Sequence, residues 1–199
     1  EAGDGRMDYF FFGGGATHTM AEVIERYSEL TGRPTMLPKW GLGHHLSRFS
    51  YDNQAWVEYI ANQSTVEDMP LDAVYLDIDY MDADADGDFA DGQLRQLTIN
   101  SKFPNPSGML NYCDARGVKV VPLIEPWLEP GDPLHGEANG LLHFIKDNGG
   151  NTVTRNIYVG AVSWFDFSSS PMQVWWRNKI VNWFNTLPFD GIWNDLTEP

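Results

Sequence analysis

Hydrophobic and polar positions along this 199-residue chain alternate in blocks that predict strands separated by helices. The second candidate strand, "LDAVYLDID", has a continuous apolar middle, which is typical of a strand covered by helices on both faces. Repeated units of this kind indicate an α/β barrel or a doubly wound sheet of parallel strands. The candidate strands cover residues 40–47, 71–79, 118–126 and 191–195, and the helices between them cover residues 53–63, 105–117 and 170–184.

A further helix is predicted near the N-terminus by its boundary residues. Thr19 and Glu22 have the spacing of a capping box, Gly32 suits the C-terminal cap, and Pro34 prevents further propagation. Residues 7–15, "MDYFFFGGG", read as a strand that ends in a flexible turn. The pattern therefore predicts a strand and a well-capped helix ahead of the four βα units.

Boundary residues also place the later helices. Asn53 is the predicted N-cap of the first helix between the strands, with Trp56 and Val57 facing inward. Ser170 is the predicted N-cap of the last helix, and Gln173 stands three residues after it, as in a capping box.

Acidic residues recur where each predicted strand should end. Asp77 and Asp79 follow the second strand, Glu125 the third, and Asp195 and Glu198 the fourth. In an α/β barrel these strand ends line one face, on which barrel enzymes carry their chemistry. Each acid alone could equally be a helix cap or a loop residue. A closed barrel has eight strands, so four strands with converging acids predict the first half of a catalytic domain.

The charge balance and the composition restrict the classes of partner that the protein is expected to bind. The 13 basic and 28 acidic residues give a net charge of −15, which argues against nucleic acid or an anionic membrane as the main partner. No apolar run approaches the roughly 18 residues of a membrane span. The 8 Trp, 8 Tyr and 11 Phe exceed the needs of a core, and surplus rings can stack on neutral sugars. Cys113, the one cysteine, excludes an intrachain disulfide and is expected in the core.

Four motifs in order carry a family resemblance. "LPKWGLGHHLSRFSYDN", "MPLDAVYLDIDYMD", "KVVPLIEPW" and "FDGIWNDLTEP" resemble the opening of the catalytic barrel of glycoside hydrolase family 31. The stretch "YSELTGRP" resembles the linker that leads from the family's N-terminal β-sandwich. The resemblance implies that residues 1–37 end the sandwich and form the linker helix. Residues 38–199 would then hold strands 1 to 4 of a (β/α)8 TIM barrel, with the remainder of the barrel following Pro199.

The resemblance also implies an activity. Members are mostly retaining α-glucosidases that act on oligosaccharides or α-glucans, and their nucleophile falls here on Asp195. A retaining glycosidase needs an ionised carboxylate about 5 Å from a protonated one. Glu198 would orient and tune the site, and the acid/base Asp would lie beyond residue 199. No cofactor is expected for catalysis, and the family's use of extracellular glucans favours a secreted protein.

Further substrate contacts carry over from the family. Asp77 matches the Asp that hydrogen-bonds hydroxyls of the sugar just before the cleaved bond, with Ile78 packed beside it. Trp193 and Leu196 flank the nucleophile and would line the same pocket. Tyr158 falls where many members place an aromatic sugar platform, although a loop ring that caps the core is an equal alternative.

Two departures from the family pattern keep other functions open. Leu196 and Thr197 replace the usual Met and Asn, and Glu125 and Trp127 replace the usual Asp and a small residue or His. Trp127 would add bulk at the pocket mouth, where an acceptor sugar could stack. An α-glucosyl or isomaltosyl transferase is therefore an alternative to a hydrolase. A non-catalytic carbohydrate-binding relative is a second alternative.

The acidic stretch after the second strand contains part of a calcium-binding pattern. Asp82, Asp84, Asp86 and Gly87 reproduce the first half of a calcium loop, in which alternate Asp oxygens surround the ion. The twelfth position is Gln93, so the bidentate Glu of such loops is missing. The stretch therefore has two interpretations: it binds a structural Ca²⁺ beside the active site, or it is a solvated acidic loop without a metal ion.

Overall fold

The structure is a computed structural model that describes residues 9–17, 19–83 and 94–197. The chain divides into two compact units, residues 1–38 and residues 39–199. That residues 1–37 end a β-sandwich stays a prediction.

The first unit contains α1 (Met20–Thr31), which has the predicted caps. The Glu22 N–H donates to Thr19 Oγ1 at 3.3 Å, and the Thr19 N–H donates to Glu22 Oε2 at 3.0 Å. Gly32 has a φ of +83° and donates to the Ser28 carbonyl, so the predicted C-terminal cap is also confirmed. The predicted strand is not present in residues 9–15, because no neighbouring segment among the described residues pairs with their backbone.

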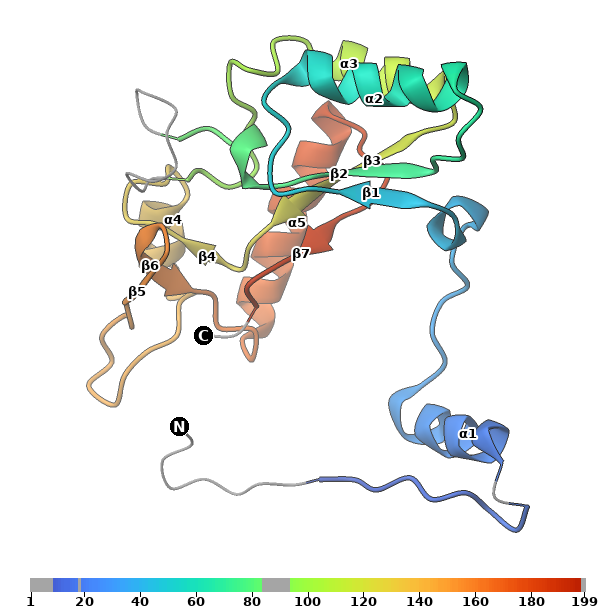
Figure 1. Ribbon diagram of the computed structural model, residues 1–199. Helices are drawn as coiled ribbons and strands as arrows, with labels where there is room; N and C mark the ends of the chain where they lie inside the picture. The colour runs from blue at the N-terminus through green and yellow to red at the C-terminus, as the bar shows by residue number, and fades with distance from the viewer. Residues whose placement is uncertain (1–8, 18, 84–93, 198–199) are drawn as a thin grey trace. The chain divides into compact units, whose positions relative to one another are not determined.

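The second unit is built on a sheet of four parallel strands in the order β1-β2-β3-β7 (Figure 1). These strands are β1 (His45–Ser47), β2 (Ala73–Leu76), β3 (Lys119–Ile124) and β7 (Trp193–Asn194). Leu46 is opposite Val74, Val74 is opposite Val120, and Leu123 is opposite Trp193. All four predicted strands are thus present, in the predicted order and direction.

The first strand is shorter than the sequence predicts, because η1 (Lys39–Leu42) is a 3-10 helix. The carboxylate of Asp72 lies against Gly43 and accepts the His44 N–H at 2.9 Å. A Cβ at residue 43 would collide with that carboxylate, so the glycine permits the close approach that precedes β1.

Two helices cover one side of the sheet and lie side by side (Figure 1). They are α2 (Gln54–Val66) and α3 (Pro106–Asp114). Asn53 caps α2 as predicted, since its Oδ1 accepts the Trp56 N–H at 3.1 Å. Trp56 itself does not face inward. It is 42% exposed and contacts Tyr59 edge to face, whereas Val57, one residue further around the helix, is fully buried.

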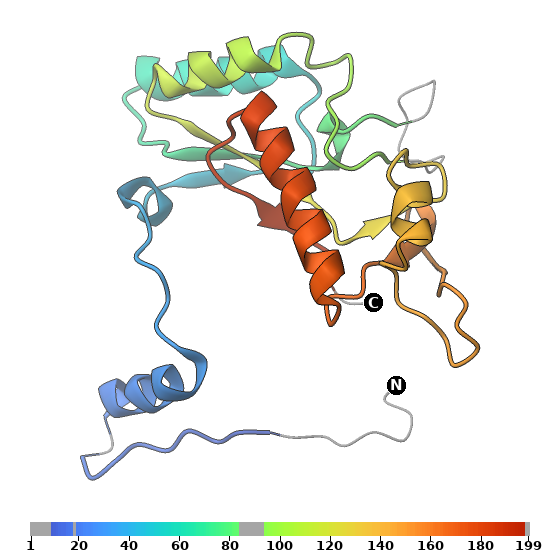
Figure 2. The same cartoon turned by 180° about the vertical axis from the view of Figure 1, so that it is seen from behind.

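The longest helix, α5 (Ser170–Thr186), crosses behind β3 and β7 in Figure 1 and lies in front of them in Figure 2. Its N-cap is Ser169 rather than the predicted Ser170, and no side chain caps it. Gln173 donates to the Phe167 carbonyl at 2.7 Å, so the predicted capping box does not form. Within residues 9–17, 19–83 and 94–197, no helix combines the length and the hydropathy that a membrane crossing requires.

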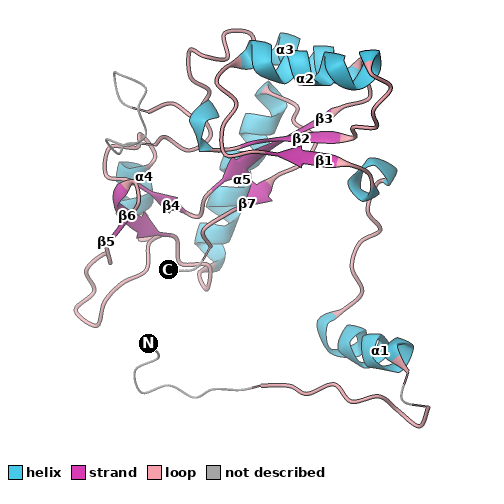
Figure 3. Cartoon of the chain, in the orientation of Figure 1, coloured by secondary structure: helices cyan, strands magenta, loops and turns pink. Residues whose placement is uncertain are grey.

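A second, smaller sheet lies between β3 and α5 in sequence and was not predicted (Figure 3). It is antiparallel, with the order β4-β6-β5. Its strands are β4 (Trp127–Leu128), β5 (Arg155–Ile157) and β6 (Gly160–Trp164), and α4 (His135–Gly140) lies between β4 and β5 in sequence. The turn between β5 and β6 carries Tyr158, so this sheet positions one of the predicted site residues.

The core includes the layer in which α2 and α3 cover the sheet, and it extends to α5 and the second sheet. Val74 and Val120 of the strands are buried together with Met109 and Cys113 of α3. Burial raises the pKa of the Cys113 thiol to about 12, as expected for a core cysteine that stays protonated.

Candidate active site

Three carboxylates meet at the carboxyl ends of three neighbouring strands. Asp77 follows β2, Glu125 follows β3, and Asp195 follows β7. Because these strands are parallel and adjacent, their ends lie at the same edge of the sheet. The charge of Asp195 raises the pKa of both Asp77 and Glu125, so the three groups lie within electrostatic reach of one another.

Asp195 is placed by the end of the β3–β7 pairing. Its N–H donates to the Ile124 carbonyl at 3.1 Å and extends the ladder by one residue. Side chains alternate along a strand, so Trp193 and Asp195 point to one face and Asn194 points to the other. Leu196 follows with a φ of +43°, an uncommon conformation for leucine that turns the chain directly after the carboxylate.

Asp77 begins the short 3-10 helix η2 (Ile78–Tyr80). Its Oδ1 accepts the Ile78 N–H at 2.7 Å, and the Ile78 side chain is buried. Burial raises the pKa of Asp77, the hydrogen bond from Ile78 opposes this, and the charges of Asp195 and Asp79 add to it. One oxygen of Asp77 is therefore held by the backbone while the carboxyl as a whole stays half-buried.

Glu125 is 1% exposed and belongs to a hydrogen-bonded group of three residues. The Tyr158 hydroxyl donates to Glu125 Oε1 at 2.8 Å, and Gln96 Nε2 donates to Glu125 Oε2 at 3.3 Å. The Glu125 N–H in turn donates to Gln96 Oε1 at 3.1 Å. Each carboxylate oxygen thus has its own donor, as a buried acid requires.

Burial raises the pKa of Glu125 to about 8. The hydrogen bonds from Tyr158 and Gln96 lower it, and the charges of Asp195 and Asp77 raise it again. Burial also raises the pKa of Tyr158 and of Tyr80, and the Glu125 carboxylate raises both further. Burial therefore favours the neutral form of the Glu125 side chain, whereas the two hydrogen bonds that it accepts favour the ionised form.

We expect this pKa to make stability depend on pH. The pKa of Glu125 is about 8 in the folded protein against 4.5 for the free group, so its contribution is fully present below pH 4.5 and is lost as the pH rises through 8. Asp77 contributes in the same direction. Over this range we expect the free energy of unfolding to fall by an amount on the order of a few kcal/mol.

Urea unfolding of the wild type and of Glu125→Gln at several pH values would measure this loss. The variant should lose less stability with rising pH. His135 and His143 have lowered pKa values and act in the opposite direction, but they cancel in the comparison because both proteins contain them. Equal pH slopes in the two proteins would contradict the expectation.

Tyr158 reaches the site from the β5–β6 turn. Its hydroxyl is bound to Glu125, whereas the residue as a whole is 51% exposed. The charges of Asp77 and Asp195 act on it as well as that of Glu125. The fold therefore brings Tyr158 beside the three carboxylates as a half-exposed residue.

Aromatic rings form a row on the same face of the sheet as Asp195. The ring centroids of Trp193 and Tyr75 are 6.2 Å apart, and those of Tyr75 and His45 are 5.6 Å apart. His45 binds the Tyr75 hydroxyl at 3.1 Å and the Trp40 carbonyl at 2.8 Å through its two ring nitrogens. The row gives Trp193 a fixed support below the carboxylates.

The sequence model of the glycosyl hydrolases family 31 TIM-barrel domain matches residues 34–199. The chain belongs to glycoside hydrolase family 31. Its four parallel strands are the first half of the family 31 barrel, as the resemblance implied.

Relatives in family 31 are much longer than this chain. The chain is 33% identical over 98% of its length to alpha-glucosidase 2 of Bacillus thermoamyloliquefaciens, of which it covers 23%. It is 28% identical over 89% of its length to lysosomal alpha-glucosidase of Rattus norvegicus, of which it covers 18%. It thus spans less than a quarter of either relative.

Solved family 31 structures have the same fold. The alpha subunit of glucosidase II matches with a TM-score of 0.79 at 26% identity, over 92% of this chain and 19% of that chain. A family 31 dextranase of Flavobacterium johnsoniae, complexed with glucose, matches with a TM-score of 0.76 at 25% identity, over 87% of this chain and 20% of that chain.

Trp127 is buried and does not lie at a pocket mouth, where the sequence analysis expected it. It is fully buried in β4, opposite Trp164 of β6, and its indole N–H has no hydrogen-bond partner among the described residues. After Pro126 the chain enters the second sheet, and Trp127 is the first residue of its strand β4. Trp127 is therefore a core residue and offers no face to a sugar at a pocket mouth.

Four predicted residues, Glu198, Asp84, Asp86 and Gly87, lie outside the described residues. Asp82 is described, and its backbone pairs with that of Arg95. No group of three or more metal-binding side chains occurs in residues 9–17, 19–83 and 94–197. The calcium site stays a prediction.

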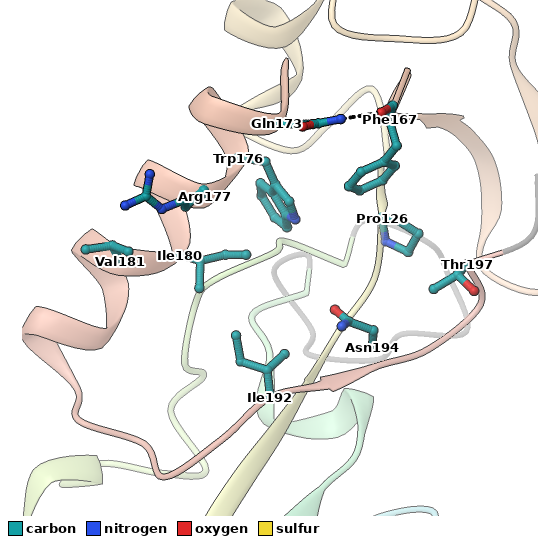
Figure 4. Close-up of a pocket in the computed structure, with 10 residues that line it drawn as sticks. All are labelled: Pro126, Phe167, Gln173, Trp176, Arg177, Ile180, Val181, Ile192, Asn194 and Thr197. Carbon is teal, nitrogen blue, oxygen red and sulfur yellow. Dashed lines mark hydrogen bonds between the residues drawn. The ribbon is translucent and has the colours of Figure 1, made fainter. Parts of the chain in front are cut away.

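A pocket of about 700 Å³ lies between α5 and β7 (Figure 4). Trp176 and Ile180 of α5 line it together with Ile192 and Asn194. Asn194 alternates with Asp195, so this pocket lies on the helix-covered side of β7 and the nucleophile candidate points away from it. Its lining is mainly apolar, and the pocket is distinct from the carboxylate site.

Gln96 is the site residue that the sequence did not suggest. It is 2% exposed and binds both the backbone and the side chain of Glu125. It lies in a loop without periodicity, 29 residues before Glu125. Glu125 was predicted as a strand-end acid, but its bond to Tyr158 depends on the unpredicted β5–β6 turn.

Proposed function

We propose that this family 31 chain supplies the nucleophile side of the active site of a retaining glycosidase that acts on α-glucosidic bonds. The observation that carries the proposal is the meeting of Asp77, Glu125 and Asp195 at the ends of three adjacent parallel strands. Strand ends on this face carry the chemistry in barrel enzymes. The names of the relatives, alpha-glucosidase 2 and lysosomal alpha-glucosidase, support the substrate class.

In the proposed reaction Asp195 attacks the anomeric carbon of the sugar. A bond forms between an Asp195 oxygen and that carbon, and the bond to the leaving oxygen breaks with its electron pair. An acid from the part of the barrel beyond residue 199 gives its proton to the leaving oxygen. The same group then takes a proton from water, which displaces Asp195 and restores the original anomeric configuration.

The other predicted residues have binding roles in this proposal. Asp77 accepts hydrogen bonds from hydroxyls of the reacting sugar through the oxygen that Ile78 does not bind. Trp193 and Leu196 line the pocket on either side of Asp195. Glu198 supports the site, although it lies outside the described residues.

We propose hydrolysis rather than transfer. Transfer and hydrolysis share the glycosyl enzyme and differ in whether a sugar hydroxyl or water accepts the glycosyl group. Because Trp127 is buried, it offers no ring on which an acceptor sugar could stack. Products formed from maltooligosaccharides test this choice: free glucose agrees with hydrolysis, and longer or cyclic products would contradict it.

The covalent intermediate provides the decisive experiment. A 5-fluoro-α-glucosyl fluoride should accumulate as an ester on the enzyme that carries this chain with the rest of a family 31 barrel, because the fluorine slows the release of the sugar. Peptide mapping by mass spectrometry should place the label on Asp195, and Asp195→Asn should remain unlabelled. Turnover of an α-glucoside with the label on another residue would overturn the proposal.

A further inference from the structure

We propose that Glu125 is a positioning residue that holds the ring of Tyr158 at the sugar-binding face of the site. The proposal rests on the proposed function and adds to it a role for a buried acid that is neither nucleophile nor proton donor. The two residues differ in exposure: Glu125 is 1% exposed, whereas Tyr158 is 51% exposed.

Tyr158 needs an anchor because of its position. It lies in the turn that joins β5 to β6, and Gly160 directly after the turn has a φ of +112°. A half-exposed ring on such a turn would populate several rotamers, and ordering it on sugar binding would cost conformational entropy. The 2.8 Å bond from its hydroxyl to Glu125 Oε1 fixes the far end of the ring before any ligand arrives.

Glu125 is itself fixed from the opposite side. Gln96 Oε1 accepts the Glu125 N–H, which leaves Gln96 Nε2 to donate to Glu125 Oε2. The Gln96 N–H donates to the 3% exposed Asp132 at 2.8 Å. A continuous set of hydrogen bonds therefore connects Tyr158 through Glu125 to Gln96 and Asp132, and the nearby Leu94 N–H donates to Glu129 at 2.7 Å.

Glu125 does not need to react in order to affect binding. The two bonds that its carboxylate accepts come from Tyr158 and Gln96, and the bond from Tyr158 engages the hydroxyl and not a face of the ring. A ring held at its hydroxyl can stack on a neutral sugar while that hydroxyl stays occupied. Loss of the anchor should therefore weaken substrate binding and act mainly on KM.

The test is a double-mutant cycle on the active enzyme with 4-nitrophenyl α-glucoside as substrate. Tyr158→Phe removes the anchored hydroxyl and keeps the ring, and Glu125→Met removes the acceptor at similar size. We expect each change to raise KM about 3- to 10-fold, in line with the loss of one hydrogen bond to a buried acid. The double variant should be no worse than the more impaired single variant, because both changes break the same bond.

Two further variants separate positioning from folding. Glu125→Gln keeps an oxygen and an N–H that can bond Gln96 and Tyr158, so it should recover most of the KM lost in Glu125→Met. Tyr112→Phe on α3, remote from the site, is the matched control for the loss of a tyrosine hydroxyl and should leave KM unchanged. Thermal unfolding of each variant shows whether it is folded.

The outcomes distinguish this proposal from the proposed function. KM effects that add in the double variant, or a wild-type KM in Tyr158→Phe, would overturn the positioning role while the glycosidase activity stands. The absence of turnover in the wild-type enzyme would instead overturn the proposed function. An effect of Glu125→Met on melting temperature alone would also count against positioning.

Discussion

Replacing Asp195 with asparagine should lower kcat on α-glucosides by at least about 10³-fold, because a neutral amide cannot form the glycosyl ester. The change is nearly isosteric, and the Asp195 N–H that bonds the Ile124 carbonyl belongs to the backbone and is retained. The β3–β7 pairing should therefore survive and the protein should keep its fold. Steady-state kinetics together with a thermal melt would separate the loss of chemistry from a loss of structure.

The matched control for this change is Asp68→Asn. Asp68 is an exposed carboxylate in the turn that joins α2 to the amino end of β2, at the edge of the sheet opposite the three carboxylates. This control substitution removes the same charge by the same change of side chain, and it should leave kcat unchanged. Wild-type turnover by Asp195→Asn on every α-glucoside tested would show that the nucleophile lies elsewhere.

Replacing Trp127 with alanine should have the largest effect on stability. The side chain is fully buried, and its removal leaves a cavity as well as lost apolar burial. Changes of this size in a core cost about 3–5 kcal/mol. For a protein of this length we expect the melting temperature to fall by about 10 °C, which scanning calorimetry can measure.

Phenylalanine at the same position provides the comparison. Trp127→Phe keeps an aromatic ring and removes part of the volume, so it should cost less, about 1–2 kcal/mol. KM should stay close to wild type in this variant, since the ring contacts the core and not the substrate. A large rise in KM with an unchanged melting temperature would instead support the acceptor-stacking role that the sequence suggested for Trp127.

Local patterns predicted the parts of the fold that depend on near neighbours. The apolar middle of β2, the cap at Asn53 and the capping box at Thr19 each involve residues within a few positions of one another, and each is confirmed. The predicted N-cap at Ser170 was wrong by one residue, and the Gln173 side chain bonds the Phe167 carbonyl instead of a capping residue. Such competition between two acceptors cannot be read from spacing alone.

Contacts between distant segments account for what the sequence did not predict. The bonds that Glu125 accepts come from Gln96, 29 residues before it, and from Tyr158, 33 residues after it. Trp127 belongs to a second sheet whose strands are only two to five residues long and show no clear alternation. The strand-end acids could be predicted because parallel strands bring their ends together whatever the loops between them do.

The shortness of β7 has a consequence for insertions and deletions. Only Trp193 and Asn194 pair with β3, and the next residue is the proposed nucleophile. One extra residue between α5 and β7 would shift the strand by one position and place the amide of Asn194 where the carboxylate of Asp195 now lies. Substitutions in the connection between α5 and β7 should therefore be tolerated. Insertion or deletion of one residue there should instead leave a folded protein in which the proposed nucleophile, Asp195, is displaced from the site.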